Sequence, residues 1–517
     1  MASARKRYAA MVSLREPFLD RARECAQYTQ PYLLPPEGHS YSQKLTTPYQ
    51  GLGSRGVNNL ASKLLLILMP PNTTNFKLDV DDYQVQQMVD EGGDATRGEL
   101  EDEFSRIERA VVRDLESTTI RVQLSEGLKL LLVTGNIAVV QDDEGSARVF
   151  RLDQYVCRRD PSSGNVLEVI TKEEVVPETL SPEIQMACDA APKADGDSTK
   201  VTEVYTRWLL DGNKWLVQQE INDVLVPGSE GSYPKEKTPL VVPATHRLDG
   251  EDYGRGFVEM LLGDLKTFDG LSRHLLDAAA ASAKTLILRN PNGVTRAKDL
   301  ERPNLSIVNG SAADVTAMRL DKGADMQVPF GQAQNISDRL EAQFLLPSSI
   351  QRSGDRVTAT EIRAAASELE DALGGIYSVL ARELQLPIVA FQLARLQRQK
   401  RIPQLPAGVI RPRITTGLQA LGRGHDLDKI RGFISDLSQL GNPQVTEALG
   451  VKTRELTARV AAAWGVDTTD LFLSEEEQAA ASQQAQMQQM MQQIGPDAAN
   501  QMMGSIRDQA KQEAPNA

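Results

Sequence analysis

The fold of this chain is decided by residues 351–400, which read QRSGDRVTATEIRAAASELEDALGGIYSVLARELQLPIVAFQLARLQRQK. The stretch opens with a polar loop, 351–357, which contains Arg352, Gly354, Asp355 and Arg356. Glycine and charge at these positions predict a flexible loop at the surface. We interpret it as a mobile basic loop that faces a polyanion.

A long helix is predicted directly after this loop, over residues 358–400. Thr358 is the expected N-cap, because Glu361 stands three residues later, as in a capping box. Apolar residues then recur at helical spacing. Gly374-Gly375 and Pro387 predict that the helix bends or breaks. Such a helix suits a subunit that packs helix against helix in an assembly.

The composition is acidic and poor in aromatic residues. The 517 residues suffice for about three or four domains. Aromatic residues make up 5% of the chain and charged residues 25%, which favours several small aliphatic cores over one large core. The net charge is −13, from 57 basic and 70 acidic side chains, whereas a conventional nucleic-acid-binding protein carries a basic face.

The cysteines and the apolar runs predict a cytosolic setting. No CxxC pair is present among the three cysteines, Cys25, Cys157 and Cys188, so reduced thiols are expected. The basic N-terminus is not followed by an apolar run, so no signal peptide is expected. The longest apolar run, Leu64–Met69, is far shorter than the ~20 residues of a membrane span and predicts the buried end of a helix.

The first half of the chain reads as helices followed by a β-rich region. Helices are predicted over 1–30, 57–65 and 80–133, the last interrupted by Gly92-Gly93. Short β-type runs separated by turn residues follow at Val139-Val140, Val149-Phe150, Tyr155-Val156, Val166–Ile170 and in a hairpin over 201–226. Residues 182–200 predict a loop or a loosely attached helix.

The second half reads as two helices that flank a small insert. A helix over 256–284 would be ~42 Å long at about 1.5 Å per residue. The insert, 285–328, is a mixed module with β-type pieces at 286–288 and 305–308, and a helix over 333–346 follows it. Prolines after residue 400 predict a loop before further helices, and the Gln/Met-rich tail, 476–517, is expected to be partly disordered.

One segment matches a nucleotide-binding motif. Gly51–Gly56 reads GLGSRG, a GxGxxG pattern that precedes a predicted helix. A dinucleotide-binding turn also needs an apolar strand just before it, and the preceding Thr46–Gln50 contains Pro48. The competing interpretation is a flexible turn that packs closely on a helix. A nucleotide-dependent enzyme using Gly51–Gly56 is therefore kept as an alternative hypothesis.

Other catalytic and metal-binding patterns are missing from the sequence. It contains no GxxxxGK[ST] and no HExxH, and its four histidines show no metal-ligand spacing. Carboxylate clusters such as Glu99–Glu103 are typical of solvated helix faces. The sequence therefore predicts no catalytic residue, no metal site and no cofactor.

Two basic groups are candidate contact sites. Arg352 and Arg356 would either contact phosphate or pair with Asp355 or Glu361. The second group lies in the insert, beside a turn that contains Asn292, and is either a docking surface or ordinary solvated charge. It comprises Arg289, Arg296, Lys298 and Arg302.

The stretch RVTATEIRAAASELEDALGGIYSVLARELQLP, within 351–400, resembles the portal (head–tail connector) proteins of short-tailed, autographivirus-type bacteriophages. Further pieces that resemble them are EPFLDRARECAQYTQPYL (16–33), GLGSRGVNNLASKLLLILMP (51–70), EDYGRG (251–256) and ITTGLQALGRGHDLDK (414–429). These pieces follow in order over most of the chain. Residues 172–200 and the C-terminal tail match poorly.

The resemblance implies an α+β fold that is mainly α. It divides the chain into a wing (1–250, with a β-hairpin part at about 131–250), a first stem helix (251–284), a clip (285–330), a second stem helix (331–350), a tunnel loop (351–357), a long kinked wing/crown helix (358–400) and a crown (401–475). On the same basis, the tunnel loop with Arg352, Gly354, Asp355 and Arg356 faces a DNA channel. The clip docks the terminase through Arg289, Asn292, Arg296, Lys298 and Arg302.

The resemblance also implies partners. Twelve identical subunits would form a ring at one capsid vertex, and double-stranded DNA would pass through it non-specifically during packaging and ejection. Expected partners are the terminase large subunit, major capsid and scaffolding proteins, internal core proteins, and tail adaptor and tail tube proteins. The expected location is the virion, with the host cytoplasm during assembly. A different ring-forming tail adaptor is a further alternative, which the length and the paired helices disfavour.

Overall fold

The computed structural model describes residues 3–40, 42–70, 76–80, 97–188, 201–283, 285–301, 303, 306–307, 309–319, 323–346, 376–405 and 410–414. The chain divides into two units. The second unit consists of Gly98–Asp102 and Gly422–Ala517, so nearly every described residue belongs to the first. The fold below is that of the first unit.

Helices build the N-terminal part of this unit: α1 (Ala4–Gln27), α2 (Leu52–Leu68), α4 (Arg97–Ser117) and α5 (Ile120–Thr134). The helices predicted over 1–30 and 57–65 are confirmed. The helix predicted over 80–133 is wrong at Val80, which lies in strand β1 (Phe76–Val80), and between α4 and α5. There the hydroxyls of Ser117 and Thr118 donate to the carbonyl oxygens of Asp114 and Leu115, at 2.8 and 2.7 Å. Such bonds compete with the helical backbone pattern.

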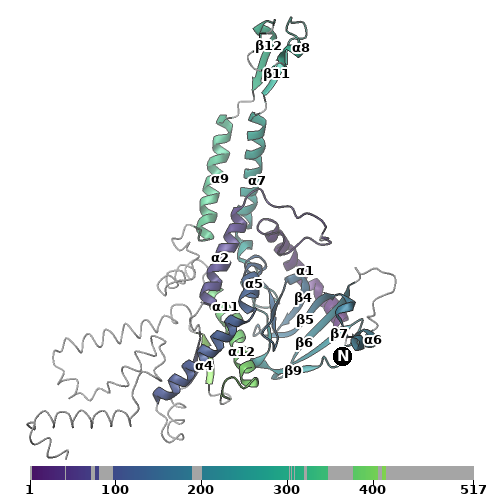
Figure 1. Cartoon of the computed structure of the whole chain (residues 1–517), viewed down its shortest axis with the longest axis vertical. Helices are drawn as coiled ribbons and strands as arrows, with labels where there is room; N and C mark the ends of the chain where they lie inside the picture. Colours follow the sequence, from purple (N-terminus) through teal and green to yellow (C-terminus); the bar gives the residue numbers. More distant parts are fainter. Residues whose placement is uncertain are drawn as a thin grey trace, which may run out of the picture. The chain divides into compact units, whose positions relative to one another are not determined.

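A six-stranded antiparallel sheet forms the β-rich region, with α1 against one face (Figure 1). Its strands are β4 (Tyr155–Arg159), β5 (Val166–Val175), β6 (Thr202–Asp211), β7 (Lys214–Ile221), β8 (Val224–Leu225) and β9 (Gly231–Pro234). A smaller sheet pairs β2 (Ala138–Gln141) with β3 (Ala147–Phe150) and β10 (Leu240–Val241). The predicted β-type runs and the hairpin over 201–226 are confirmed.

Short helical segments connect these strands. They are η1 (Leu152–Gln154), η2 (Pro177–Thr179), α6 (Pro182–Ala187) and η3 (Lys235–Lys237). Residues 182–200 were predicted as a loop or a loosely attached helix, and α6 is such a helix. It packs through Ile184 against a small separate cluster around Cys188 and Val204.

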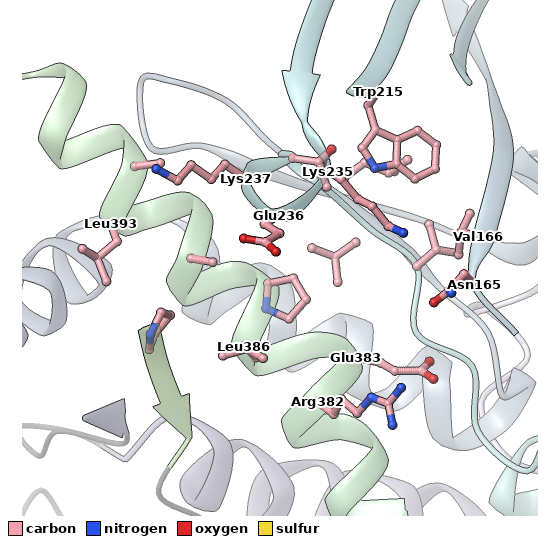
Figure 2. A pocket seen from close by; sticks show the side chains of 18 of the residues that line it. Asn165, Val166, Trp215, Lys235, Glu236, Lys237, Arg382, Glu383, Leu386 and Leu393 are labelled. Atoms are coloured by element: carbon pink, nitrogen blue, oxygen red, sulfur yellow. Dashed lines mark hydrogen bonds between the residues drawn. The ribbon is translucent and has the colours of Figure 1, made fainter. Parts of the chain in front are cut away.

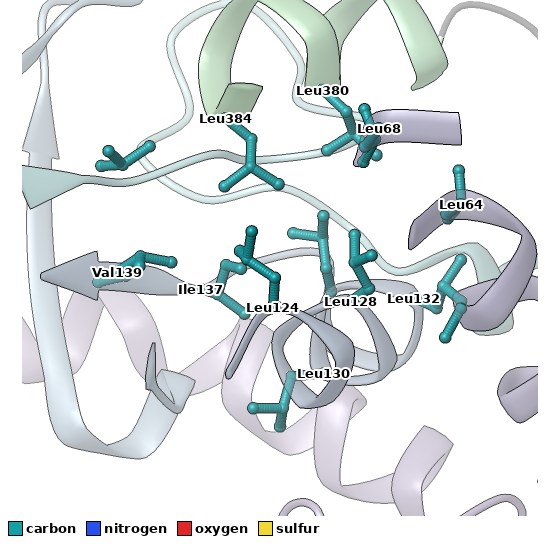
Figure 3. Close-up of a cluster of buried hydrophobic side chains, with 14 of the residues drawn as sticks. Leu64, Leu68, Leu124, Leu128, Leu130, Leu132, Ile137, Val139, Leu380 and Leu384 are labelled. Atoms are coloured by element: carbon teal, nitrogen blue, oxygen red, sulfur yellow. The ribbon is translucent and has the colours of Figure 1, made fainter. Parts of the chain in front are cut away.

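The main hydrophobic core lies where α2, α5 and β2 meet the C-terminal helices (Figure 3). Leu68 of α2 lies beside Leu380 of the C-terminal helix there, Leu64 lies near Leu132 of α5, and Leu384 lies above Leu124 in the view. The end of the predicted apolar run, Leu64–Met69, is thus buried, as expected for a helix that ends before proline.

The described part of the C-terminal region is a distorted helix and one strand. The helix consists of α11 (Ile376–Leu380), a π-helical turn η5 (Ala381–Gln385) and α12 (Leu386–Arg398). The distortion predicted at Pro387 is confirmed, because the π turn ends one residue before α12 and Pro387 lies in the first turn of α12. Thr358, Glu361 and Gly374-Gly375 lie outside the described residues.

One strand pair was not predicted at all. Strand β13 (Ile410–Ile414) pairs antiparallel with β1 (Phe76–Val80), and Pro412 lies opposite Leu78. The prolines after residue 400 predicted only a loop there. Pro412 is tolerated because a two-stranded ladder has edges where no backbone N–H is needed.

Candidate functional site

Two helices that flank a small hairpin module are the candidate site. Helix α7 (Phe257–Ala283) and helix α9 (Gly323–Gln343) lie side by side (Figure 1). Between them in sequence stand β11 (Thr285–Arg289), α8 (Ala297–Leu300), η4 (Ala312–Asp314) and β12 (Val315–Arg319). The prediction of two helices around an inserted module is confirmed.

Two details of this region differ from the prediction. The second β-type piece was expected over 305–308, but Ser306 and Ile307 are not in a strand, and the partner of β11 is β12. The second helix was expected from Ala333, but α9 begins at Gly323 and includes Pro329. Pro329 is the seventh residue of α9, beyond its first turn, where proline removes one backbone hydrogen bond of the helix.

The start of α7 is fixed by a segment of close backbone contacts, Glu251–Gly256. The Asn136 side chain exchanges two hydrogen bonds with the Gly254 backbone, at 2.7 and 2.8 Å. A β-carbon at Gly254 or Gly256 would overlap the carbonyl oxygens of Thr245 and Val133. Only glycine allows this approach, so the EDYGRG segment aims α7 by backbone contact.

Ion pairs and a loop hold the first half of α7 against the rest of the unit. The Arg21 guanidinium of α1 lies 3.4 Å from the Glu259 carboxylate. The Asp269 carboxylate accepts a hydrogen bond from the backbone N–H of Tyr49 at 2.6 Å. Arg339 of α9 pairs with Asp264 at 2.8 Å. Among the α7 residues up to 282, the last fully buried one is Leu265, and the main helical neighbour of the second half of α7 is α9.

The end of α9 is anchored on α2. The Phe344 ring lies against Gly56, where a β-carbon would overlap it. Asn59 donates to the carbonyl oxygens of Phe344 and Leu345 at 2.9 and 3.0 Å, and Lys63 donates to Leu345 at 3.0 Å. These donors satisfy carbonyls that a helix end leaves free, and the Lys63 charge suits the negative end of the helix dipole.

The GxGxxG segment has a packing role in this structure. Helix α2 begins at Leu52, and no strand precedes it in the described residues 42–51. A β-carbon at Gly53 would lie 2.6 Å from the carbonyl oxygen of Tyr28. Gly53 and Gly56 face protein rather than an open cradle, whereas Gly51 has no atom near its β-carbon position, and this favours the interpretation of Gly51–Gly56 as a close-packing turn.

The hairpin module carries the predicted clip residues on its surface. Arg289 ends β11, Asn292 lies in the following turn, Arg296 is the N-cap of α8 and Lys298 lies in α8; all four are exposed. None of them forms a salt bridge with a described residue. The structure thus gathers them on one small module. Arg302 lies outside the described residues, as do Arg352, Gly354, Asp355 and Arg356.

A buried threonine organises this module. Thr295 is 3% exposed, and its backbone N–H and hydroxyl both donate to Asp314, at 3.1 and 3.0 Å. The same hydroxyl accepts the backbone N–H of Ser311 at 3.0 Å. Hydrogen bonds from the Thr295 backbone, above all, lower the pKa of Asp314. Nothing in the sequence around Thr295 predicted this.

A buried ionic cluster was also missed by sequence reasoning. Asp114 of α4 pairs with Arg395 and Arg401, and it accepts a hydrogen bond from Gln392. The Asp114 side chain is 2% exposed and that of Arg395 is 5%. The cluster joins α4 to α12. In the sequence these residues look like ordinary charges on helix surfaces, because their partners are far away along the chain.

Groups suited to catalysis or metal binding are scarce in the described part of the chain. No cluster of three metal-ligating side chains occurs among its residues. The described cysteines are buried and unpaired, and burial raises the pKa of Cys25 to about 12 and that of Cys157 to about 11. Among the described helices, none combines the length and hydropathy that crossing a bilayer requires.

Comparison with known proteins identifies the family. The family described as bacteriophage head to tail connecting protein matches residues 1–472. The chain belongs to this family. The portal protein of Enterobacteria phage T3 is 38% identical over 486 residues, 92% of this chain and 88% of the relative. That of Escherichia phage T7 is 37% identical over 488 residues, with the same shares covered.

A solved structure, the virion of a native gene transfer agent particle, contains a chain that is 11% identical. It aligns with a TM-score of 0.34 over 77% of this chain and 89% of that chain. From its family and its sequence relatives, the chain is a portal protein of T7-like phages, a head–tail connector, and portal proteins are structural parts of the virion at the portal vertex.

Proposed function

We propose that this portal protein closes into a ring of twelve subunits whose channel conducts double-stranded DNA into the capsid and later out of it. The observation that carries the proposal is the pair α7–α9 with the hairpin module between them. In this proposal α7 is the first stem helix, residues 285–330 are the clip and α9 belongs to the second stem helix. The clip range overlaps the first turns of α9, which begins at Gly323.

Exposed apolar side chains support burial of this region in an assembly. Large apolar residues on α7 and α9 are more than half exposed, namely Met260, Leu276, Val328 and Phe330. In the module, Ile287 and Leu288 are neighbours on β11 and both are exposed, so neither face of the hairpin is covered within the subunit. A two-stranded hairpin with two open faces is marginally stable alone, and large exposed apolar patches mark contact surfaces.

The charge of the helix pair suits a conduit. Helix α7 carries Glu259, Asp264, Asp269 and Asp277 against Lys266 and Arg273, and the described ends of α9 are also acidic. Duplex DNA has one charge per about 1.7 Å, so a ~42 Å stem faces about 25 phosphates. If basic side chains of the wall neutralised 6–10 of these phosphates, the ring would bind the DNA tightly and the DNA would not slide. Twelve chains of −13 give −156, which fits a wall that lets DNA slide.

A local basic constriction is the second part of the proposal. Arg352 and Arg356 of the tunnel loop, 351–357, repeated around the ring, would touch the DNA backbone without reading bases. The anchored end of α9 at Phe344 stands shortly before this loop in the sequence. The double variant R352A/R356A should assemble into rings and lose packaged DNA. Normal packaging and genome retention by this variant would contradict the assignment.

The clip is proposed to dock the terminase large subunit. Arg289, Asn292, Arg296 and Lys298 lie exposed on one module, and Arg302 follows them in sequence. Deleting Asn290–Asn309 should leave rings intact and abolish terminase binding in a pull-down. A finer test is R296E/K298E, with R5E/K6E on α1 as the control of equal charge change. Terminase binding by the deletion variant would reassign the clip.

The remaining family partners complete the proposal. The wing (1–250), the wing/crown helix (358–400), the crown (401–475) and the tail (476–517) would contact major capsid, scaffolding and internal core proteins, and the clip would later meet tail adaptor and tail tube proteins. The subunit would be made in the host cytoplasm. Native mass measurement of the purified assembly tests the ring: a mass near twelve times 56.7 kDa is expected, and a stable monomer would overturn it.

A further inference from the structure

A hollow of about 990 Å³ lies away from the stem and the clip, between the six-stranded sheet and the C-terminal helix (Figure 2). One wall is the segment η3 with Trp215 at the start of β7, and the other is the π-helical turn η5 with α12. The volume is at the upper end of the range for ligand pockets. The hollow has no role in the proposed DNA channel.

The hollow combines apolar walls with unpaired cations at its mouth. Side chains of Val166, Trp215, Leu386 and Leu393 supply apolar surface (Figure 2). Lys235, Lys237 and Arg382 line the hollow, are exposed, and form no salt bridge with any described residue.

The other charged groups of the lining change this balance little. The Arg159 guanidinium donates to the carbonyl oxygens of Asp252, Gly164 and Val242, and the Arg159 backbone N–H donates to the Asp252 carboxylate at 2.7 Å. The Glu383 carboxylate accepts the backbone N–H of Ala244 at 3.3 Å. Glu236 is the other carboxylate of the lining, and Arg247 is a further cation, which donates to the carbonyl oxygen of Glu251 at 3.3 Å. The mouth therefore carries a net positive charge on a chain whose net charge is −13.

The backbone at this wall is unusual. Arg382 lies within the π-helical turn Ala381–Gln385. π-Helical turns are rare and occur frequently at functional sites, because they sacrifice regular helix geometry. The turn thus places an exposed arginine at the mouth of the hollow, opposite the lysines of η3 (Figure 2).

We propose that this hollow binds an acidic peptide segment of another protein, one that carries bulky apolar side chains between its carboxylates. The apolar walls would take the apolar anchors, and Lys235, Lys237 and Arg382 would pair with the carboxylates. A nucleic acid duplex presents phosphates but no apolar side chains, so it cannot use the walls. Charge complementarity and apolar burial together favour a peptide.

The test is fluorescence anisotropy with full-length protein and a short labelled peptide of alternating leucine and glutamate. Saturable binding is expected, and K235E/K237E should weaken it at least about tenfold, since opposed charges then meet. The control K6E/K44E makes the same charge change at exposed lysines outside the lining and should bind as the parent does. Ala390 also lines the hollow, and A390F should weaken binding by filling it.

Three probes decide between this occupant and others. A peptide with lysine for glutamate, and one with serine for leucine, should each bind at least about tenfold more weakly. Any weakening of binding to a labelled DNA duplex should be no greater for the K235E/K237E variant than for the K6E/K44E control. The proposal is overturned by equal binding of either control peptide, by DNA binding that depends on Lys235 and Lys237 alone, or by the absence of saturable peptide binding.

Discussion

The ring of Phe344 lies directly on Gly56, and there is no space between them for a β-carbon. Phe344 also packs edge-on against Phe257 at the start of α7, with ring centroids 6.2 Å apart. One aromatic side chain therefore joins the end of α9 to the start of α7 and to α2. This contact fixes the end of α9 against both of the other helices.

The first prediction concerns this contact. Gly56→Ala should lower the free energy of unfolding by about 1–3 kcal/mol, because the added carbon displaces a buried ring. Gly51→Ala is the matched control within the same GxGxxG segment, since a β-carbon there meets no atom within 4 Å. Gly51→Ala should lower the free energy of unfolding by less than about 1 kcal/mol. Thermal unfolding measures both, and equal losses would contradict the packing role of Gly56.

The second prediction concerns the buried ionic cluster. Asp114→Ala should lower the free energy of unfolding by about 3–5 kcal/mol, because it leaves the buried Arg395 without its counter-charge. The control is Asp143→Ala, which removes the partner of Arg398 in a pair whose side chains are 62% and 47% exposed. That loss should be at most about 1 kcal/mol. Denaturant unfolding would show the difference, and a mild effect at Asp114 would show that the cluster is dispensable.

The third prediction concerns the anchor of α9. Asn59→Ala removes donors to the carbonyl oxygens of Phe344 and Leu345, so the last turn of α9 should open more often. Deuterium uptake over residues 336–346 should rise, while uptake over α1 stays unchanged. Asn335→Ala, at an exposed position of α9, is the control and should leave that uptake as in the parent. Unchanged uptake in Asn59→Ala would mean that the ring contact alone holds the helix end.

The fourth prediction concerns the hairpin module. Thr295→Val should make it more susceptible to proteolysis, since Asp314 and the Ser311 N–H each lose a hydroxyl partner. Thr316→Val on β12 is the control and should have little effect. Acid should also make the module more susceptible to proteolysis, because the pKa of Asp314 is lowered in the folded protein. The stabilisation that the Asp314 carboxylate provides is complete above the pKa of the unfolded chain, about 3.9, and is lost as the pH falls below that value. Parental resistance of Thr295→Val would exclude this role.

The fifth prediction concerns Cys25. Burial raises its pKa to about 12 from the model-compound value of 9.0. The unfolded chain then loses its thiol proton more readily, so stability is retained below about pH 9 and falls as the pH rises towards 12. In a C157A/C188A background, alkylation at pH 8 should be at least about 10³-fold slower than in denaturant. Rapid alkylation of the native protein would contradict the burial.

Local patterns in the sequence predicted most helices and strands. The apolar stripes of α1, α2 and α7 repeat at helical spacing, and the β-type runs between 138 and 226 are separated by turn residues; both signals lie within short windows. Pro387 predicted the distortion that the π turn shows, because a missing backbone N–H acts on neighbouring residues. The family resemblance rested on the same local segments.

Long-range partnerships were invisible at that level. Strand β1 pairs with β13, more than 300 residues later, and neither segment was predicted as a strand, because each finds its partner only in the folded chain. Thr295 and Asp114 carry no local mark of their roles, because burial and partners arise only when distant segments meet. The hollow between η3 and η5 arises in the same way.

The sequence by itself determined the family, the order of the helices and the inserted module, since periodicity, turn residues and motif spacing are properties of adjacent residues. Only the tertiary structure decided what Gly56 faces, which carboxylate Arg395 meets and where Lys235 and Arg382 come together. Those relationships depend on packing between segments far apart in the chain, and packing is set by the shape and charge of all the neighbours at once.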